Sequence, residues 1–355
     1  MTPSNPQKGI KITLDDLANI HIGESVPAPI VQAEPGSRSY GTVTEASGQA
    51  PAAERERGNL LLQGWFYLGV AGLVGALVGW AICEPGFVDG QRGFHWGNLL
   101  IMPVLVAMMT LGFGIAESVV ERSMKKALIR SALALPLGVL LGFVFYFMAN
   151  IVFNVGLGIC AELGVQSNRS PAFWIVRAIA WTVFGAAGGL VYGIVGHSYK
   201  KGKFGVLGGV LGAGIGGVLF DPISMGTGGS SAALSRAVGF AIFGLATGAM
   251  MGVVESALKD RWFYVTSGPL AGKQFILYKP QTSIGSDQQS DIYLFKDPAI
   301  LPSHAALEAN GARMTLRAVG PVFVSGSPVS SRVLLDGDLV QIGRYTFRYK
   351  EKTRS

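Results

Sequence analysis

Charged side chains are scarce in this sequence. They make up 14% of its 355 residues, whereas an ordinary soluble domain contains roughly 25%. They are almost absent from six apolar stretches, at residues 59–82, 98–120, 128–153, 172–196, 204–220 and 237–258. A helix in a soluble core shows a polar face at every turn, and these stretches show none. This absence excludes a soluble helical domain and predicts six membrane-spanning helices, because about 20 apolar residues cross a bilayer.

Sequence motifs of the common catalytic sites are also missing. There is no nucleophile elbow, no pair of metal-ligating side chains within a span and no glycine-rich phosphate loop. The sequence therefore predicts neither an enzyme nor a bound metal or cofactor. No secretory signal peptide opens the chain, because the first apolar stretch follows a polar segment. We expect the first span to act as an uncleaved signal anchor.

Residues 1–57 have little apolar surface to bury. They are rich in Pro, Ser, Gly, Ala, Glu and Gln, and only residues 11–22 are apolar enough to dock as a short helix or strand. Such a composition cannot offset the entropy that a chain loses on ordering. We therefore expect a disordered N-terminal segment on the cytoplasmic side.

Lysine and arginine are unevenly divided between the two sets of loops that six spans create. One set holds eleven of them, and the other holds three, namely Arg92, Arg169 and Arg236. Because cytoplasmic loops carry the excess of positive charge, both termini are predicted to face the cytoplasm, with the spans in a plasma (inner) membrane. The net charge of +7 then reflects topology, and we expect the lipid bilayer rather than nucleic acid as a partner.

The sequence contains only two cysteines, Cys83 and Cys160. They follow the predicted outer ends of the first and third spans, and a pair on the oxidising side could form a disulfide. Two unrelated small apolar residues are the alternative that we favour, because only geometry shows whether two cysteines meet.

Three of the stretches look like copies of one unit. Residues 177–193 (RAIAWTVFGAAGGLVYG) align with residues 236–252 (RAVGFAIFGLATGAMMG), and the end of the second span at residues 114–118 resembles residues 252–256. Glycines recur at every fourth residue in the first two segments, and glycine at this spacing lets helix backbones approach closely in a membrane. We expect tight helix packing or homo-oligomerisation, with a bundle that lines a transport pathway as the alternative.

Ionisable residues inside the predicted spans are few. Glu117 and Glu255 occupy equivalent places about one turn from the cytoplasmic ends of the second and sixth spans, where contacts with Glu121 and Lys259, respectively, are within reach. A pair of carboxylates can bind a cation, but we favour groups that are solvated or paired at headgroup depth. Arg177 and Arg236 begin the fourth and sixth spans, and we expect them to extend to the outer headgroups.

The chain changes character after residue 258. Short alternating runs separated by turn residues predict an antiparallel β-sandwich over residues 262–350. Its landmarks are, in order, GPLAGKQFIL at 268–277, IG at 284–285, SDIYL at 290–294, His304 with Ala305, FVSG at 323–326 and LDGDLVQIG at 335–343. This order resembles the forkhead-associated domain over about a quarter of the chain, and the closing LDGDLVQIG is its most specific part.

The resemblance implies a phosphothreonine-binding module with an arginine, a serine and an asparagine in its loops, but this sequence departs at all three places. Ser286 stands where the family has arginine, Leu301 where it has serine, and Ser325 at the later asparagine. His304, which braces a loop in the family, is kept, with Ser303 beside it. Because a phosphate dianion needs donors to replace its water, we expect the loops to bind an unmodified partner or to dock on the chain's own membrane block.

These features predict an α-helical polytopic membrane domain followed by an all-β domain that resembles the forkhead-associated fold. We expect an integral membrane adaptor or scaffold that recruits a cytoplasmic protein, in Ser/Thr-kinase-linked signalling as the resemblance implies. The alternative is a small-solute or ion transporter or channel that the β-domain regulates. A continuous polar cavity past Glu117 and Glu255 favours transport, whereas a dry bundle packed on glycine favours a scaffold.

Overall fold

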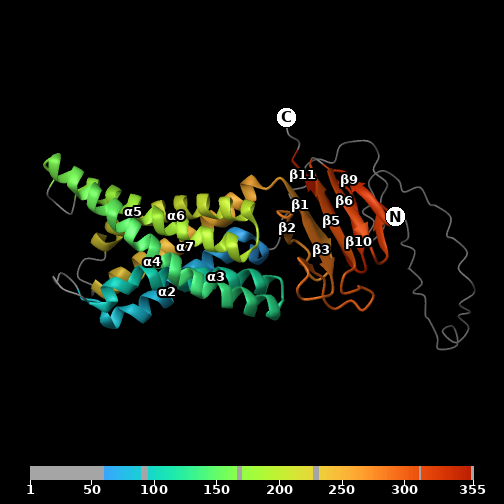
Figure 1. Cartoon of the computed structure of the whole chain (residues 1–355), viewed down its shortest axis with the longest axis horizontal. Coiled ribbons are helices and arrows are strands. Elements are labelled where there is room, and N and C mark those ends of the chain that lie inside the picture. Colours follow the sequence, from blue (N-terminus) through green and yellow to red (C-terminus); the bar gives the residue numbers. More distant parts are fainter. Residues whose placement is uncertain (1–59, 89–94, 166–169, 227–231, 312, 353–355) are drawn as a thin grey trace, which may run out of the picture. The chain divides into compact units, whose positions relative to one another are not determined.

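Six long helices form from the apolar stretches (Figure 1). The computed structural model describes residues 60–88, 95–165, 170–226, 232–311 and 313–352. Its long helices are α2 (Gly64–Cys83), α3 (Trp96–Val120), α4 (Met124–Glu162), α5 (Pro171–Val195), α6 (Tyr199–Gly226) and α7 (Ala232–Leu258), and short 3₁₀ turns η1 (Leu60–Leu62) and η2 (Glu84–Gly86) flank α2. All six long helices have the length and apolar composition needed to cross a membrane. The predicted disordered segment 1–57 lies outside the described residues.

Helix α4 extends well beyond the predicted stretch 128–153, with 39 residues in all. It begins at Ser123, whose hydroxyl accepts a hydrogen bond from the Lys126 amide and so caps the helix. It ends where Gly164 adopts a positive φ of 71° and the Val165 amide donates to the Cys160 carbonyl. The added residues are 124–127, which include two lysines, and 154–162, which are mostly apolar.

The helices pack in the order of the chain, and α7 closes the ring by packing against α2. The backbones meet at glycines. A Cβ atom on Gly72 of α2 would lie 2.1 Å from the carbonyl oxygen of Gly244 on α7, and a Cβ on Gly185 of α5 would lie 2.1 Å from that of Gly209 on α6. Gly185 and Gly244 are equivalent in the internal repeat, so both copies use the same glycine to bring a neighbouring helix into contact.

The described C-terminal residues form two β-sheets (Figure 1). One sheet has the order β2-β1-β11-β10-β7-β8 and the other β4-β3-β5-β6-β9. The strands are β1 (Arg261–Ser267), β2 (Gln274–Ile276), β3 (Gln281–Gly285), β4 (Ile292–Tyr293), β5 (Ala305–Asn310), β6 (Arg313–Ala318), β7 (Val322–Val324), β8 (Ser327–Pro328), β9 (Ser331–Leu334), β10 (Leu339–Ile342) and β11 (Tyr345–Glu351). Neighbouring strands in the described sheets run antiparallel except β3 and β4, which run parallel.

The core of this β-sandwich is aromatic. Phe263 on β1 stacks on Phe347 of β11 at 5.3 Å between ring centroids and meets the edge of Tyr349 at 6.0 Å. All three side chains are fully buried. The turn before β10 explains the most specific landmark of the sequence, because Gly337 adopts a φ of 92° while Asp338 accepts a hydrogen bond from the Leu335 amide at 2.9 Å.

Candidate functional site

The loops at one end of the sandwich are held together by His304. Its Nδ1 accepts a hydrogen bond from the Leu301 amide at 3.1 Å, and its Nε2 donates to the Pro321 carbonyl at 3.0 Å. The ring is buried, and a Cβ on Gly320 would lie 2.3 Å from it. His304 therefore connects the loop before β5 to the loop before β7, and Gly320 leaves the space that the ring needs.

The hydroxyl groups in these loops are engaged within the chain. The Ser286 hydroxyl donates to the Ile300 carbonyl at 2.8 Å, and the Ser325 hydroxyl contacts Asp338 at 3.3 Å. Leu301 and Val319 lie on either side of His304 with 43% and 74% of their surfaces exposed, and Ser303 is exposed beside them. The predicted recognition loops thus expose two apolar side chains, Leu301 and Val319, beside Ser303 and carry no cation at the position of Ser286.

The loop between β3 and β4 contacts the turn between α3 and α4. The Ser123 hydroxyl donates to the Gln288 carbonyl at 3.0 Å, and the Lys125 amide donates to the Gln288 side chain at 3.2 Å. Lys126 Nζ donates to the Asp291 carbonyl at 3.1 Å. One of the loops that the resemblance assigns to partner binding is therefore occupied by the helices of the same chain.

Glu117 and Glu255 lie near the C-terminal ends of α3 and α7, and both are engaged by other elements. Lys201 Nζ on α6 lies 2.5 Å and 2.6 Å from the two oxygens of Glu117, and Arg130 lies 3.2 Å from it. Glu255 accepts hydrogen bonds from the hydroxyl of Tyr278, at 2.5 Å, and from that of Tyr192, at 3.4 Å.

Helical spacing suggested contacts of Glu117 with Glu121 and of Glu255 with Lys259, but the shortest contacts of these side chains are with other residues. Glu121 pairs with Lys126 at 2.9 Å instead of contacting Glu117, and Lys259 donates to Gln274 and lies over the Trp262 ring instead of pairing with Glu255. Helical spacing places these side chains within reach of one another, but cations and hydroxyls from other elements provide closer partners.

Arg177 and Arg236 have carboxylate partners at the other end of the bundle. Arg177 pairs with Asp221 of α6, and Arg236 donates to the Glu84 carboxylate at 3.1 Å and 2.5 Å. Each guanidinium also lies over an aromatic ring, that of Phe220 or Phe87. Sequence analysis missed both carboxylates, although each is the first acidic residue after the outer end of a predicted span.

The two cysteines are separate thiols in the structure. Cys83 and Cys160 are both free and buried. The described structure therefore contains no bond between them, and the alternative of two unrelated small residues matches its geometry.

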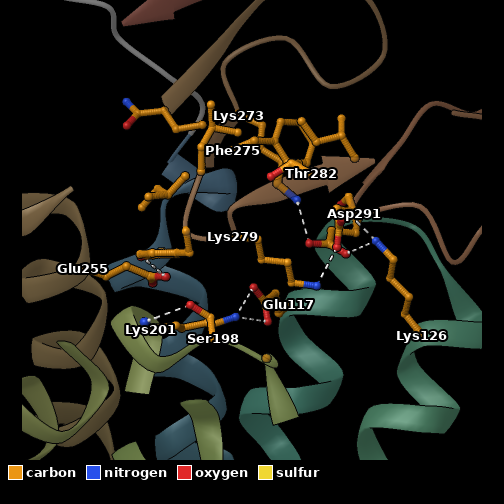
Figure 2. Close-up of a pocket in the computed structure, with 18 of the residues that line it drawn as sticks. Glu117, Lys126, Ser198, Lys201, Glu255, Lys273, Phe275, Lys279, Thr282 and Asp291 are labelled. Atoms are coloured by element: carbon orange, nitrogen blue, oxygen red, sulfur yellow. Dashed lines mark hydrogen bonds and ion pairs between the residues drawn. The ribbon is translucent and has the colours of Figure 1, made fainter. Parts of the chain in front are cut away.

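A cavity of about 560 Å³ lies between the helix ends that adjoin the sandwich and the edge of the sandwich (Figure 2). Its charged lining consists of the carboxylates Glu117, Glu121, Glu255 and Asp291 and the cations Lys126, Arg130, Lys201, Lys259, Lys273 and Lys279. Sequence analysis assigned no role to Lys273 or Lys279. Beyond the cavity, toward the middle of the bundle, Leu68, Phe113 and Met251 are fully buried and belong to one apolar cluster.

Burial and neighbouring charges shift the pKa values of three groups that line the cavity outside the predicted spans. Burial lowers the pKa of Lys273 to about 8, against the attraction of Glu121. Burial alone would raise the pKa of Glu121, but Lys273, Lys126 and Arg130 outweigh it and hold the pKa below its usual value. Burial and the neighbouring Glu255 carboxylate raise the pKa of Tyr278, so its hydroxyl keeps the proton that it donates.

Comparisons with known proteins match the C-terminal domain. A family model described as "Inner membrane component of T3SS, cytoplasmic domain" matches residues 264–353. The chain is 37% identical over 101 residues to the glycogen accumulation regulator GarA of Mycolicibacterium smegmatis, covering 28% of this chain and 63% of that protein. It is 36% identical over 84 residues to the oxoglutarate dehydrogenase inhibitor of Corynebacterium efficiens, covering 23% of this chain and 58% of that protein. This chain thus spans less than two thirds of these relatives.

Solved structures similar to the chain include the FHA domain of CT664 from Chlamydia trachomatis, with 24% identity, coverage of 27% of this chain and all of that one, and a TM-score of 0.25. The cytoplasmic domain of the T3SS sorting platform protein PscD from P. aeruginosa has 24% identity, coverage of 27% and 83%, and a TM-score of 0.24. The C-terminal β-sandwich thus resembles forkhead-associated domains, as the sequence predicts.

Proposed function

We propose that this protein is an integral membrane scaffold whose forkhead-associated domain binds a cytoplasmic protein in kinase-linked signalling, without requiring phosphothreonine. The observation that carries the proposal is the exposed pair Leu301 and Val319 at the recognition loops. Apolar side chains that are exposed beside a rigid loop bind a protein by burying area. The scaffold acts by binding rather than by catalysis.

The loop chemistry supports a partner without phosphate. Removing a charge-assisted hydrogen bond costs about 1.5–3 kcal/mol, and this chain has Ser286 in place of the family's arginine. The Ser286 hydroxyl already donates to the Ile300 carbonyl, so it is not oriented toward a ligand. Lys296 is an exposed cation ten residues further along the chain, and it is the side chain to test as a substitute.

The bundle supports anchoring rather than transport. Its charged cavity lies at the cytoplasmic end, and the buried side chains of Leu68, Phe113 and Met251 fill the space beyond it. Glycine contacts between α2 and α7 and between α5 and α6 leave the backbones no gap at those points. A bundle packed on glycine in this way can hold a domain at the membrane surface.

The comparisons support the same assignment. The matching family model is described as the cytoplasmic domain of an inner membrane component, which is the arrangement we propose here. The relatives are named as a regulator and as an inhibitor of an enzyme, and such names describe proteins that act on other proteins or processes. For this chain, the partner and the signalling setting are proposals.

The test is capture of cytoplasmic proteins by the full chain in lipid nanodiscs, with Leu301→Asp as the variant. Val333→Asp is the matched control, because Val333 on the edge strand β9 is 42% exposed, as Leu301 is 43% exposed. We expect Leu301→Asp to reduce capture of a defined partner by about tenfold, equivalent to about 1.4 kcal/mol. The control variant should capture the partner as the natural chain does.

Phosphatase treatment separates the two kinds of recognition. We expect capture to survive removal of phosphate from the lysate, and phosphothreonine peptides to bind no better than their unmodified forms. Capture that disappears with phosphatase, and that also falls in Lys296→Ala, would show that the domain recognises phosphothreonine through a substitute cation and would overturn the proposal.

A further inference from the structure

The cavity between the helices and the sandwich is lined by residues of the six long helices α2 to α7 and by the segment around β2 and β3 (Figure 2). Neither the scaffold function nor the recognition loops uses it. Its lining includes six cations and four carboxylates, so positive charge is in excess. Apolar side chains of Trp65, Ile129 and Leu133, each between 37% and 42% exposed, complete one side.

Lys273 is the least satisfied of these cations. Only 5% of its surface is exposed, and its Nζ atom is buried without a hydrogen-bond partner. The nearest carboxylate oxygen, on Glu121, lies 3.8 Å away, and the ammonium lies 4.5 Å from the centre of the Phe275 ring. A buried ammonium can donate three hydrogen bonds, and one that donates none is costly to hold in a folded protein.

Glu121 compensates the charge of Lys273 only in part, because it also pairs with two other cations and lies beyond hydrogen-bond distance of Lys273. Lys126 Nζ lies 2.9 Å from Glu121 and donates a hydrogen bond to it, and Arg130 lies 3.7 Å away. Glu117 is shared between Lys201 and Arg130 in the same way. Two carboxylates therefore face four buried or largely buried cations at this side of the cavity.

Among the described ion pairs, none joins Glu255 to Lys273. It accepts hydrogen bonds from Tyr278 and Tyr192, which hold its carboxylate in place. Asp291 is engaged as well, since it accepts from Lys279 Nζ at 2.7 Å and from the Ser283 amide at 2.9 Å. The carboxylates of the lining are thus committed, and the excess of cations calls for an anion from outside the chain.

We propose that the cavity binds a phosphate-bearing anion, with Lys273 as the cation that the anion compensates. Phosphate oxygens accept hydrogen bonds in several directions, which suits ammonium and guanidinium groups that converge from α4, α6 and the β2 segment. The volume of about 560 Å³ admits a phosphate ester larger than the inorganic ion. Basic pockets between helices on the cytoplasmic side of a membrane are suited to anionic headgroups.

Two sources carry this chemistry, an anionic phospholipid and a soluble phosphate. The test uses the full chain in phosphatidylcholine nanodiscs and titrates inorganic phosphate by calorimetry. A second arm incorporates phosphatidic acid and measures by native mass spectrometry how much of it the protein retains. Phosphate binding without lipid retention identifies the soluble source, and lipid retention identifies the headgroup.

Lys273→Met keeps the apolar stem and removes the charge, and Lys273→Arg keeps the charge. We expect Lys273→Met to weaken binding in the responding arm by at least about tenfold, while Lys273→Arg retains it. Lys200→Met is the matched control, because Lys200 lies beside Lys201 on α6 but is half exposed and pairs with Asp260 at 3.2 Å.

Binding and melting measurements on Lys273→Met can either support or overturn the anion site. Lys273→Met should also unfold at the same temperature as the natural chain or higher when no anion is present, since it removes an uncompensated charge. Equal binding by the natural chain and by Lys273→Met, or no binding in either arm, would overturn the site. A lower melting temperature of Lys273→Met without anion would show that Lys273 is only the internal partner of Glu121.

Discussion

The helix bundle and the β-sandwich differ in what fills their interiors: backbone contacts at glycines in the bundle and large side chains in the sandwich. In the bundle, helices meet backbone to backbone at glycines such as Gly72 and Gly244, and large side chains such as Leu140 and Ile151 point outward with 59% and 65% of their surfaces exposed. In the sandwich, Phe263 and Phe347 are fully buried. Lipid removes the hydrophobic drive between helices, so close approach stabilises the bundle, whereas water drives large side chains into the sandwich core.

The largest effect should come from the sandwich core. Phe263→Ala removes a fully buried ring that stacks on Phe347, so we expect a loss of about 3–5 kcal/mol of unfolding free energy. Phe323→Ala is the matched control, because Phe323 is 40% exposed on the same sheet. Amide hydrogen exchange should show faster opening of the sandwich and unchanged protection of the helices. Equal loss of protection in both domains would show that they unfold together.

The second-largest loss of stability should come from Tyr278, which lies where the two domains meet. Tyr278→Phe removes the hydroxyl that donates to Glu255 at 2.5 Å and leaves that buried carboxylate with Tyr192 alone, so we expect a loss of about 1.5–3 kcal/mol. Thermal unfolding in detergent measures this loss of stability. Tyr199→Phe is the control, since Tyr199 is 79% exposed. A melting temperature equal to that of the control would mean that the hydroxyl contributes nothing to the junction.

Two glycines of the bundle should respond to alanine substitution with stability changes of opposite sign. A Cβ on Gly244 would lie 2.2 Å from the Gly72 carbonyl oxygen, so Gly244→Ala must separate α7 from α2 and should cost about 1–3 kcal/mol. A Cβ on Gly158 of α4 meets nothing within 4 Å, so Gly158→Ala should stabilise the helix by about 0.5–1 kcal/mol. Unfolding in a denaturing detergent series compares the two. Destabilisation by both variants to the same extent would refute the role of close approach.

The smallest expected effect is the dependence of the unfolding free energy on pH that comes from the titration of Lys273. Its pKa is about 8 in the folded chain and about 10.4 when unfolded, so the unfolded state binds more protons between these values. The unfavourable burial of the ammonium is fully present below pH 8, and stability should rise with pH above it by at most about 1.4 kcal/mol per pH unit. Melting curves of the natural chain and of Lys273→Met should differ in this slope. The same dependence of melting temperature on pH in both proteins would contradict the lowered pKa of Lys273.

Sequence alone predicted the six spans and the forkhead-associated domain because both depend on local patterns. A bilayer demands a long apolar stretch, and the sharp turn at Gly337 demands glycine beside a capping aspartate. The internal repeat also indicated which glycines bring helices together, since Gly185 and Gly244 are equivalent in sequence and in contact. The helix ends were predicted less well, because α4 is capped by Ser123 beyond the apolar stretch.

The partners of the charged groups could not be predicted in this way. Arg236 pairs with Glu84 across 152 residues, and Ser123 reaches Gln288 across 165. Neither spacing nor composition relates such positions, since they depend on how helices and sheets are packed. The anion cavity escaped prediction for the same reason, because Lys273 gains its significance only from burial next to an occupied Glu121.

The sequence by itself indicated which segments are apolar enough to cross a membrane and which segment forms the β-domain, because these follow from the chemistry of each segment taken alone. Tertiary structure alone decided that a recognition loop rests against the turn between α3 and α4, and that more cations than free carboxylates gather in one cavity. The physical reason is that electrostatic compensation depends on distance in space, and that distance is set by packing.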